Sequence, residues 1–392
     1  MMNTAFSSND DFAAAEAPPI PISPRRADIK IKQAKLAELL AEMECEGVLL
    51  LEPENIHWFV SGSLMDRSWG DSDRPAIIVN PQQRCVICHT IETQRIFDDA
   101  LDGLGFLVRE WPVWGSKSDG LAEFVTRHRL AVDRPLPGAH LITPWLDAER
   151  RRLSPFEQER LAELGLALAH DLEVTAGSLQ PGDTEAEVAG QLAHRLLRHG
   201  LDPVRLEVIA DDRLRRYRRP GFTNTVVETV CQLQATASRF GLFASASRTV
   251  CFGAPTDTVR QEFDRASQLQ AIGRCSIISG QRPVNLIEAA RIHLRGTVHE
   301  HDYRLDYPGR WTGRRDVEEW FRPNSPARLD PGQAVVWQAT IGSMAVCETL
   351  LVEESRGRSF TGIEDWPIRR YVVQGERIDC PDLLVRNRPA MS

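Results

Sequence analysis

The stretch "ADDRLRRYRRPGF" (210–222) contains the residue type best suited to hold an anion, because five of its residues are arginines. A guanidinium can bind a carboxylate or a phosphate through two parallel hydrogen bonds. The same composition is also typical of a solvated loop. A loop that only faces water is therefore the preferred interpretation, and an anion site stays open as the alternative.

Histidines and carboxylates occur together in a second stretch, "HEHDYRLDY" (299–307), which contains His299, His301, Asp302 and Asp306. Such a mixed set suits zinc or another transition metal. Polar residues two apart are common on strands and loops, however. A polar surface segment is therefore the preferred interpretation.

The segment "CVICH" (85–89) matches the attachment pattern of a c-type haem, which needs two cysteines and an axial histidine. Its alternation fits a buried strand better, with Cys85 and Ile87 on one side and Val86 and Cys88 on the other. A redox dithiol would instead precede a helix. We therefore expect a structural strand here, and no cofactor in the chain.

Length and charge limit the class of protein. The chain has 392 residues, of which 42% are hydrophobic, so it is long enough for two domains. Its net charge of −8 argues against partners such as nucleic acid or an anionic membrane, because no basic excess is available to contact phosphates. No stretch reaches the roughly 18 apolar residues that a membrane helix needs.

Cysteine usage and the N-terminus indicate the compartment. Eight cysteines are scattered along the chain, most of them in apolar segments. The N-terminus lacks the basic start and apolar middle of a secretory signal. These features predict a cytoplasmic protein with reduced thiols. The acidic and proline-rich residues 1–26 are expected to form a disordered tail.

Alternating strand and helix patterns predict an α/β domain over residues 27–148. Apolar residues at helical spacing, closed by Gly47, predict a helix at 29–47, and further helices are expected at 91–105 and 120–128. The expected strands are 48–51, 75–80, 84–90, 106–111 and 130–133.

A second domain is predicted over residues 149–376, with a C-terminal tail at 377–392. Its first helix, 154–177, has the start pattern Ser154, Pro155 and Glu157, which is typical of a capping box. The next helix, 181–200, begins in the same way at Thr184. The remaining expected elements are a strand at 205–210, a hairpin around Gly241, helices at 256–272 and 284–296, and strands at 334–342 and 345–354.

Four segments follow one another along the second predicted domain: the helix pair with its "PGDTE" turn, and the strands "GLFASASRTVCFG", "LDPGQAVVWQATIG" and "CETLLVEE". With these segments in this order, residues 29–375 resemble the pita-bread clan of creatinase, prolidase, aminopeptidase P and methionine aminopeptidase. The resemblance implies an α+β fold, with an N-terminal α/β creatinase-like domain and a C-terminal pita-bread domain. It also implies a homodimer.

Peptidases of this clan hold two metal ions with two aspartates, a histidine and two glutamates, and the ions activate a bridging water. Carried over, the aspartates fall at Gln234 and Ser245, eleven residues apart, and the glutamates at Gln338 and Cys347. The histidine is expected within 299–316. Since neutral groups replace the anionic ligands, the resemblance predicts that the usual two-metal site is lost.

Creatinase hydrolyses a C–N bond without metal, with a histidine as proton shuttle and an arginine that holds the substrate carboxylate. The resemblance puts Arg219 at the place of that histidine, and Asp306 and Tyr307 where two further histidines are expected. Arginine stays protonated at neutral pH and is a poor general base. The chain therefore departs from the metal-free branch as well.

One predicted function is that of a pseudoenzyme, which binds a small anionic ligand or a peptide without cleaving it. This function needs only a pocket with suitable polar groups, and it fits the loss of the usual ligands. The expected ligand-binding residues are Arg218, Arg219, Gln234, Ser245 and Gln338.

Two catalytic alternatives stay open. A metal-independent hydrolase or lyase would act on a C–N bond of an amino-acid derivative, and Glu348, Asp306 or Tyr307 would move the proton. Cys347 would be the nucleophile only if a base lowered its pKa. An Xaa-Pro peptidase is the third possibility, and the fold alone does not establish it.

Overall fold

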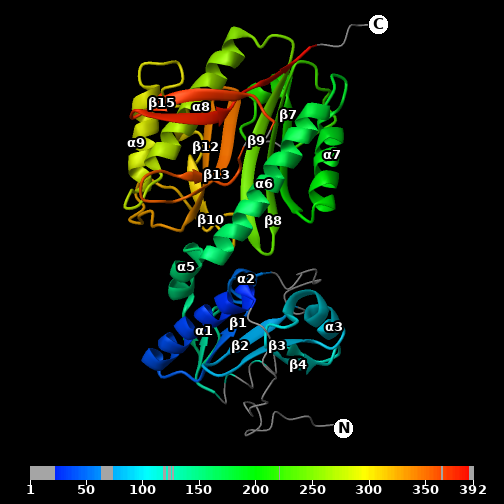
Figure 1. Ribbon diagram of the computed structural model, residues 1–392, viewed down its shortest axis with the longest axis vertical. Coiled ribbons are helices and arrows are strands. Elements are labelled where there is room, and N and C mark those ends of the chain that lie inside the picture. Colours follow the sequence, from blue (N-terminus) through cyan, green and yellow to red (C-terminus); the bar gives the residue numbers. More distant parts are fainter. Residues whose placement is uncertain are drawn as a thin grey trace. The chain divides into compact units, whose positions relative to one another are not determined.

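The computed structural model of the chain describes residues 23–62, 74–117, 121, 125, 128–219, 221–362 and 365–387. The chain divides into two compact units, Met1–Arg150 and Arg151–Ser392. Both units combine helices with sheets, which confirms the predicted α+β class (Figure 1). Most of the predicted tail 1–26 and most of the predicted helix 120–128 lie outside the described residues.

The first unit contains a six-stranded sheet in the order β4-β3-β2-β1-β5-β6. Its strands are β1 (Gly47–Leu50), β2 (Ala76–Val79), β3 (Arg84–His89), β4 (Leu107–Trp111), β5 (Leu130–Val132) and β6 (His140–Leu141). Its helices are α1 (Pro24–Met43), α2 (Pro53–Val60) and α3 (Thr93–Ile96), with a π-helical turn at Phe97–Leu101, and α5 (Thr143–Arg151) ends at the unit boundary.

Two expectations for this unit have clear outcomes. The "CVICH" segment lies in strand β3, between β2 and β4, as predicted. Burial raises the pKa of the Cys85 thiol to about 11, so this thiol is protonated at neutral pH. The helix predicted at 91–105 is shorter, because Gly103 and Gly105 adopt left-handed backbone conformations with φ of 69° and 74°.

The second unit begins with two long helices that start where their sequences predict. Helix α6 (Pro155–Ser178) follows Ser154, and helix α7 (Glu185–Arg198) follows Thr184. Both starts are complete capping boxes, in which the hydroxyl accepts from the backbone of a glutamate whose carboxylate accepts in return. The two helices pack against a four-stranded sheet in the order β17-β9-β8-β7. Its strands are β7 (Asp202–Ala210), β8 (Val230–Arg239), β9 (Leu242–Phe252) and β17 (Leu384–Arg386).

A five-stranded sheet, β11-β10-β12-β13-β14, forms the other half of this unit. Helix α8 packs on β12 and β13 so closely that a Cβ on Gly273 would lie 2.3 Å from the indole nitrogen of Trp337. Trp337 and its neighbour Gln338 must therefore point to opposite faces of β12. The elements are α8 (Asp257–Ser276), α9 (Pro283–Leu294), β10 (Gly309–Thr312), β11 (Glu319–Trp320), β12 (Ala334–Ile341), β13 (Met344–Leu351) and β14 (Arg358–Ser359).

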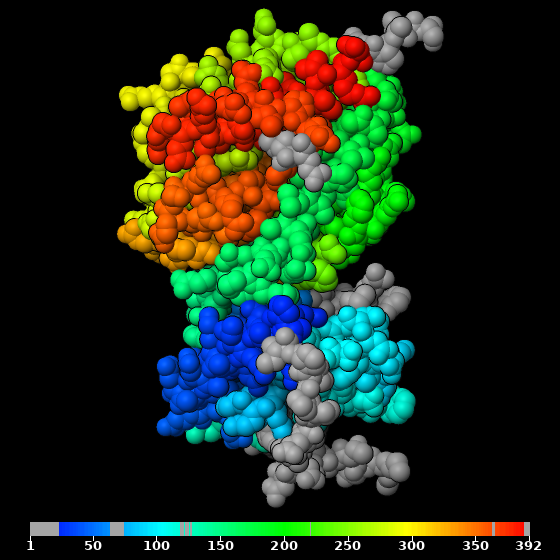
Figure 2. Space-filling view, in the orientation of Figure 1, coloured from blue at the N-terminus to red at the C-terminus, as the bar shows by residue number. Residues whose placement is uncertain are grey.

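A separate ribbon of β15 (Ile368–Val373) and β16 (Glu376–Pro381) packs against α8 and lies at the surface of the unit (Figure 2). The four-stranded and five-stranded sheets of this unit contact each other through β9 and β13. The face of each sheet that is not covered by helices therefore packs toward the other sheet. Within the described ranges, no helix combines the length and the apolar character needed to cross a membrane.

Candidate functional site

Two hairpins bring together the positions at which the clan resemblance expects metal ligands. In the β8–β9 hairpin, Thr236 lies opposite Ser245, and Gln234 lies two residues along on the same face. In the β12–β13 hairpin, Gln338 lies opposite Cys347. All of these side chains are buried. The structure thus places four of the predicted residues in one cluster, which we call the inherited cluster: Gln234, Ser245, Gln338 and Cys347.

Hydrogen bonds between β9 and β13 hold this cluster in register. The backbone N–H of Cys347 donates to the hydroxyl of Ser247 at 2.8 Å. The backbone N–H of Ser245 donates to the hydroxyl of Thr349 at 2.8 Å, and that hydroxyl donates to the Ser245 carbonyl at 2.9 Å. The two hairpins are therefore fixed to each other by polar side chains, in place of a shared sheet.

A continuous chain of polar contacts runs from the cluster to its edge. Gln234 donates from its side-chain amide to Oε1 of Gln338 at 3.3 Å. Gln338 donates in turn to Oδ2 of Asp306 at 3.1 Å. The Nε and Nη2 atoms of Arg219 donate to Oδ1 of Asp306 at 2.9 and 2.7 Å. Asp306 thus joins the predicted anion-binding arginine to the inherited cluster.

Arg310 occupies the side of the cluster next to Ser245. Its Nη2 donates to the Ser245 hydroxyl at 2.9 Å and to Oδ1 of Asp316 at 2.7 Å. Only 1% of the Arg310 side chain is exposed. According to the resemblance, a metal-binding aspartate would stand at position 245. In this structure the position holds Ser245, which accepts a hydrogen bond from the buried guanidinium of Arg310.

Arg205 completes the charge pattern from strand β7. It donates to Oδ2 of Asp316 at 2.7 Å and to the hydroxyl of Thr236 at 3.3 Å. The Thr236 hydroxyl lies 2.8 Å from that of Ser245. Asp316 therefore pairs with two arginines, and Asp306 pairs with a third.

Glu207, unlike Asp306 and Asp316, is not hydrogen-bonded to a described arginine. It lies opposite Gln234 on β7, with 8% of its surface exposed. Burial raises the pKa of its carboxyl, although Arg205, Arg219 and Arg310 oppose that rise. No hydrogen bond or ion pair joins the Glu207 carboxyl to any other described residue. Glu207 is therefore a buried carboxyl that favours its protonated form more strongly than a solvent-exposed glutamate does.

Aromatic rings form the exposed edge of the site. The ring of Tyr307 stacks on that of Trp320, with 4.8 Å between the centroids. The guanidinium of Arg219 lies over the Trp320 ring at 5.1 Å from its centroid. Tyr307 is exposed and Arg219 is partly exposed, so a ligand can reach this edge from solvent.

The chemistry of Cys347 opposes its predicted role as a nucleophile. Its thiol is buried, and burial raises its pKa to about 12, although Arg310 lies near enough to oppose that rise. A thiol with this pKa is protonated at neutral pH, and the thiolate is the reactive form.

Glu348 does not lie with the other predicted residues. It pairs with Trp337 across the β12–β13 hairpin and faces helix α8. Its carboxylate accepts from Nε of Arg274 at 2.7 Å and from the hydroxyl of Ser359 at 3.0 Å. Proton transfer between Glu348 and the Asp306 edge therefore has no direct route, because strand β13 separates the two.

Arg218 and the histidine-containing stretch have a different task. Arg218 donates to the Thr340 carbonyl at 3.1 Å and pairs with Asp302 at 3.3 Å. Asp302 also accepts from the backbone of Gly342 at 2.7 Å and lies 3.1 Å from Nδ1 of His299. These groups fasten the β12–β13 turn, so the polar-segment interpretation of 299–306 fits better than a metal site.

The residues at the inherited positions do not fit a pair of divalent ions. The two glutamine amides bond to each other, and Arg310 brings positive charge to Ser245, where a metal ion would be repelled. Neutral amide and hydroxyl groups cannot offset the charge of two such ions. In the described part of the chain, no group of three or more His, Cys, Asp or Glu residues has an arrangement that could hold a metal.

Comparison with known proteins gives the fold. No family model matches the sequence, and no curated protein matches it. Among solved structures, prolidase from Pyrococcus furiosus is 15% identical with a TM-score of 0.69, and the match covers 84% of this chain and 100% of that one. X-Pro aminopeptidase from Thermotoga maritima is 15% identical with a TM-score of 0.72, covering 90% and 99%.

A third similar structure is not named as a peptidase. The N-terminal domain of the FACT complex subunit SPT16 from Cicer arietinum is 10% identical with a TM-score of 0.58, and the match covers 87% of this chain and 96% of that one. At these identities the comparisons show the fold. The chain has the pita-bread fold, as the sequence resemblance implied, with an N-terminal and a C-terminal domain.

Four residues of this region were not predicted from the sequence. Arg205 and Glu207 were predicted only as parts of a strand, although a charged residue at every second position of a buried strand marks a polar interior face. Arg310 and Asp316 lie in "GRWTGRRD", where nothing in the spacing indicates a partner on β9. The four missed residues are Arg205, Glu207, Arg310 and Asp316.

Proposed function

We propose that this chain is a pita-bread protein that binds a small anionic ligand, or the carboxylate of a peptide, without cleaving it. The observation that carries the proposal is the buried guanidinium of Arg310, hydrogen-bonded to Ser245. A fixed cation at this place supplies the positive charge that the clan's peptidases obtain from metal. It supplies no activated water, since a guanidinium cannot deprotonate one.

The proposed binding residue is Arg219, with Asp306 as its internal ligand. Asp306 holds Arg219 with a single carboxylate oxygen in a partly exposed pair. A ligand carboxylate of similar geometry can exchange with that of Asp306, because the guanidinium has further donors to offer. The stacked Tyr307 and Trp320 provide an apolar wall for the rest of the ligand.

The test is ligand binding to the full chain and two variants, measured by calorimetry with an Xaa-Pro dipeptide and with a dicarboxylic acid. Asp306→Asn removes the competing charge and should tighten binding, whereas Arg219→Gln should weaken it about tenfold or more. Asp202→Asn and Arg216→Gln alter exposed charges elsewhere and serve as matched controls. Equal affinities in all five proteins would overturn the proposal.

A metal-independent hydrolase or lyase is the second candidate, and Glu207 is the observation that favours it. A buried carboxyl with a raised pKa, beside the arginines, is a typical general acid. If the chain turns over an amino-acid derivative, Glu207→Gln should abolish the reaction and leave binding intact. Turnover that requires added manganese would instead favour an Xaa-Pro peptidase.

A further inference from the structure

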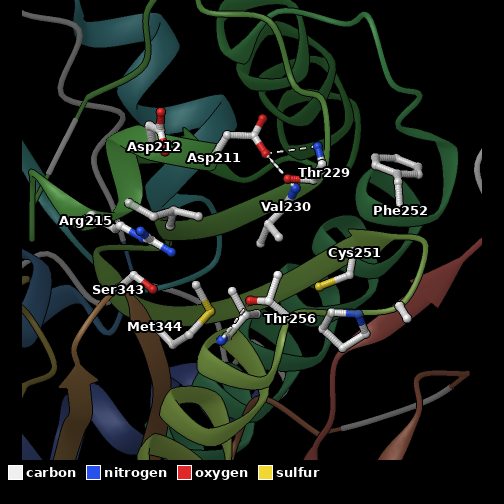
Figure 3. Close-up of a pocket in the computed structure, with 14 residues that line it drawn as sticks. Asp211, Asp212, Arg215, Thr229, Val230, Cys251, Phe252, Thr256, Ser343 and Met344 are labelled. Carbon is white, nitrogen blue, oxygen red and sulfur yellow. Dashed lines mark hydrogen bonds between the residues drawn. The ribbon is translucent and has the colours of Figure 1, made fainter.

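A pocket lies away from the inherited cluster, between the short helix Asp211–Arg215, the ends of β8 and β9, and the start of α8 (Figure 3). Its volume is about 190 Å³. A cavity of roughly 150 Å³ holds a benzene molecule. The pocket therefore has room for a small molecule and is too small for a folded partner or a nucleotide.

The floor of the pocket is apolar. Val230, Val259 and Met344 line it, together with the thiol of Cys251. Burial raises the pKa of this thiol to about 11, so it is neutral and behaves as a small hydrophobic group. Such a floor accepts a short hydrocarbon chain or a ring.

The acidic groups at the pocket are either occupied or directed away from it. The carboxylate of Asp211 accepts from the backbone N–H groups of Glu228, Thr229 and Val230. It also accepts from the Thr229 hydroxyl. Asp212 also lines the pocket with an exposed side chain, and in Figure 3 its carboxylate points away from Arg215 and Val230. Neither carboxylate is therefore available to bind a cation inside.

Among the described residues that line the pocket, Arg215 is the one with a positively charged side chain. Its guanidinium points inward beside Ser343 and Met344 (Figure 3). No hydrogen bond or ion pair joins it to another described residue, in contrast to Arg218 and Arg219. The start of α8, at Thr256, adds the positive end of a helix of 20 residues.

We propose that this pocket binds a small monocarboxylic acid with an apolar chain or ring, whose carboxylate pairs with Arg215. The apolar part enters toward Val230 and Val259. A dicarboxylic acid fits less well, because its second charge would lie against the apolar floor. The site is separate from the proposed Arg219 site, and neither proposal depends on the other.

The test is a titration of the full chain with butyrate, 3-methylbutyrate and benzoate, followed by ligand-observed NMR and calorimetry. Each acid is compared with its uncharged amide, which keeps the shape and removes the charge. The expected result is saturable binding of the acids at millimolar or lower concentration and much weaker binding of the amides. Equal binding of acid and amide would overturn the role of Arg215.

Variants locate the site. Arg215→Gln should weaken binding of the acids by about tenfold to a hundredfold, the range for one charge-assisted pair. Arg216→Gln, an exposed neighbour outside the pocket, should leave it unchanged. Val259→Phe should block binding by filling the pocket, and circular dichroism tests whether this variant folds. Acid binding that survives Arg215→Gln, or that is lost on Arg219→Gln, would contradict the proposal.

Discussion

The side-chain amide of Gln234 donates to the amide oxygen of Gln338 at 3.3 Å, so one hydrogen bond joins two residues from different hairpins. The resemblance expects carboxylates at both positions, facing metal ions. In this chain the two glutamines contact each other directly. Gln338 also donates to Asp306, which in turn accepts from Arg219. Polar contacts between side chains thus hold together the region where the clan's peptidases use metal.

The first prediction concerns this chain of contacts. Gln338→Glu removes the donor to Asp306 and places a second carboxylate beside it, in a buried position. We expect the free energy of unfolding to fall by about 1–3 kcal/mol. Urea denaturation at neutral pH measures the change. Gln82→Glu, on an exposed turn, is the matched control, and an equal effect in both variants would contradict the account.

The second prediction concerns Glu207, whose carboxyl has a raised pKa because it is buried. Between the unfolded pKa, about 4.3, and the raised folded pKa, the folded state binds more protons than the unfolded state. Stability due to this group therefore falls as the pH rises through that window. Glu207→Gln should stabilise the chain at neutral pH, and the difference should vanish below about pH 4.

Denaturation curves of wild type and Glu207→Gln at several pH values test this sign. The exposed Glu228→Gln should show no comparable pH dependence. If Glu207→Gln were less stable than wild type at neutral pH, Glu207 would be ionised and paired in the folded state, against the geometry described.

The third prediction concerns Cys347. A buried thiol with a pKa of about 12 should resist alkylation in the folded protein. The partly exposed Cys45 should react faster. Mass spectrometry after brief iodoacetamide treatment compares the two. Rapid labelling of Cys347 would restore it as a candidate nucleophile.

The fourth prediction concerns Glu348, which pairs with Arg274 on the α8 side of β13. Removing one partner of a buried pair leaves the other without compensation, so Glu348→Gln should cost about 3–5 kcal/mol of stability. It should leave ligand binding at Arg219 unchanged, as should the exposed control Glu354→Gln. Lost binding in a folded Glu348→Gln protein would contradict the placement of Glu348.

Local signals predicted much of the fold. Two helix starts were predicted from capping boxes, in which the contacting residues are only three positions apart. These pairs are Ser154 with Glu157 and Thr184 with Glu187. The predicted helix at 91–105 was too long, because two glycines near its end override the helical pattern. Other ends were also misplaced: the helix predicted at 29–47 runs from Pro24 to Met43, and the predicted tail 377–392 contains strand β17, which pairs with β9.

The site was harder to predict because its contacts join distant segments. Gln338 reaches Gln234 across 104 positions, and Arg219 reaches Asp306 across 87. Sequence alternation alone could have separated Cys347 from Glu348, since neighbours on a strand face opposite sides. The expected homodimer, the cytoplasmic location and the ligand class remain predictions.

The most direct test of the account is the metal content of the purified chain, measured by elemental analysis before and after loading with manganese, cobalt or zinc and desalting. We predict no stoichiometric metal, because the inherited cluster offers two amides, a hydroxyl and a protonated thiol where carboxylates are needed, and the guanidinium of Arg310 lies beside it. Two ions per chain, lost in Gln234→Ala and Gln338→Ala, would contradict the account and indicate a metallopeptidase.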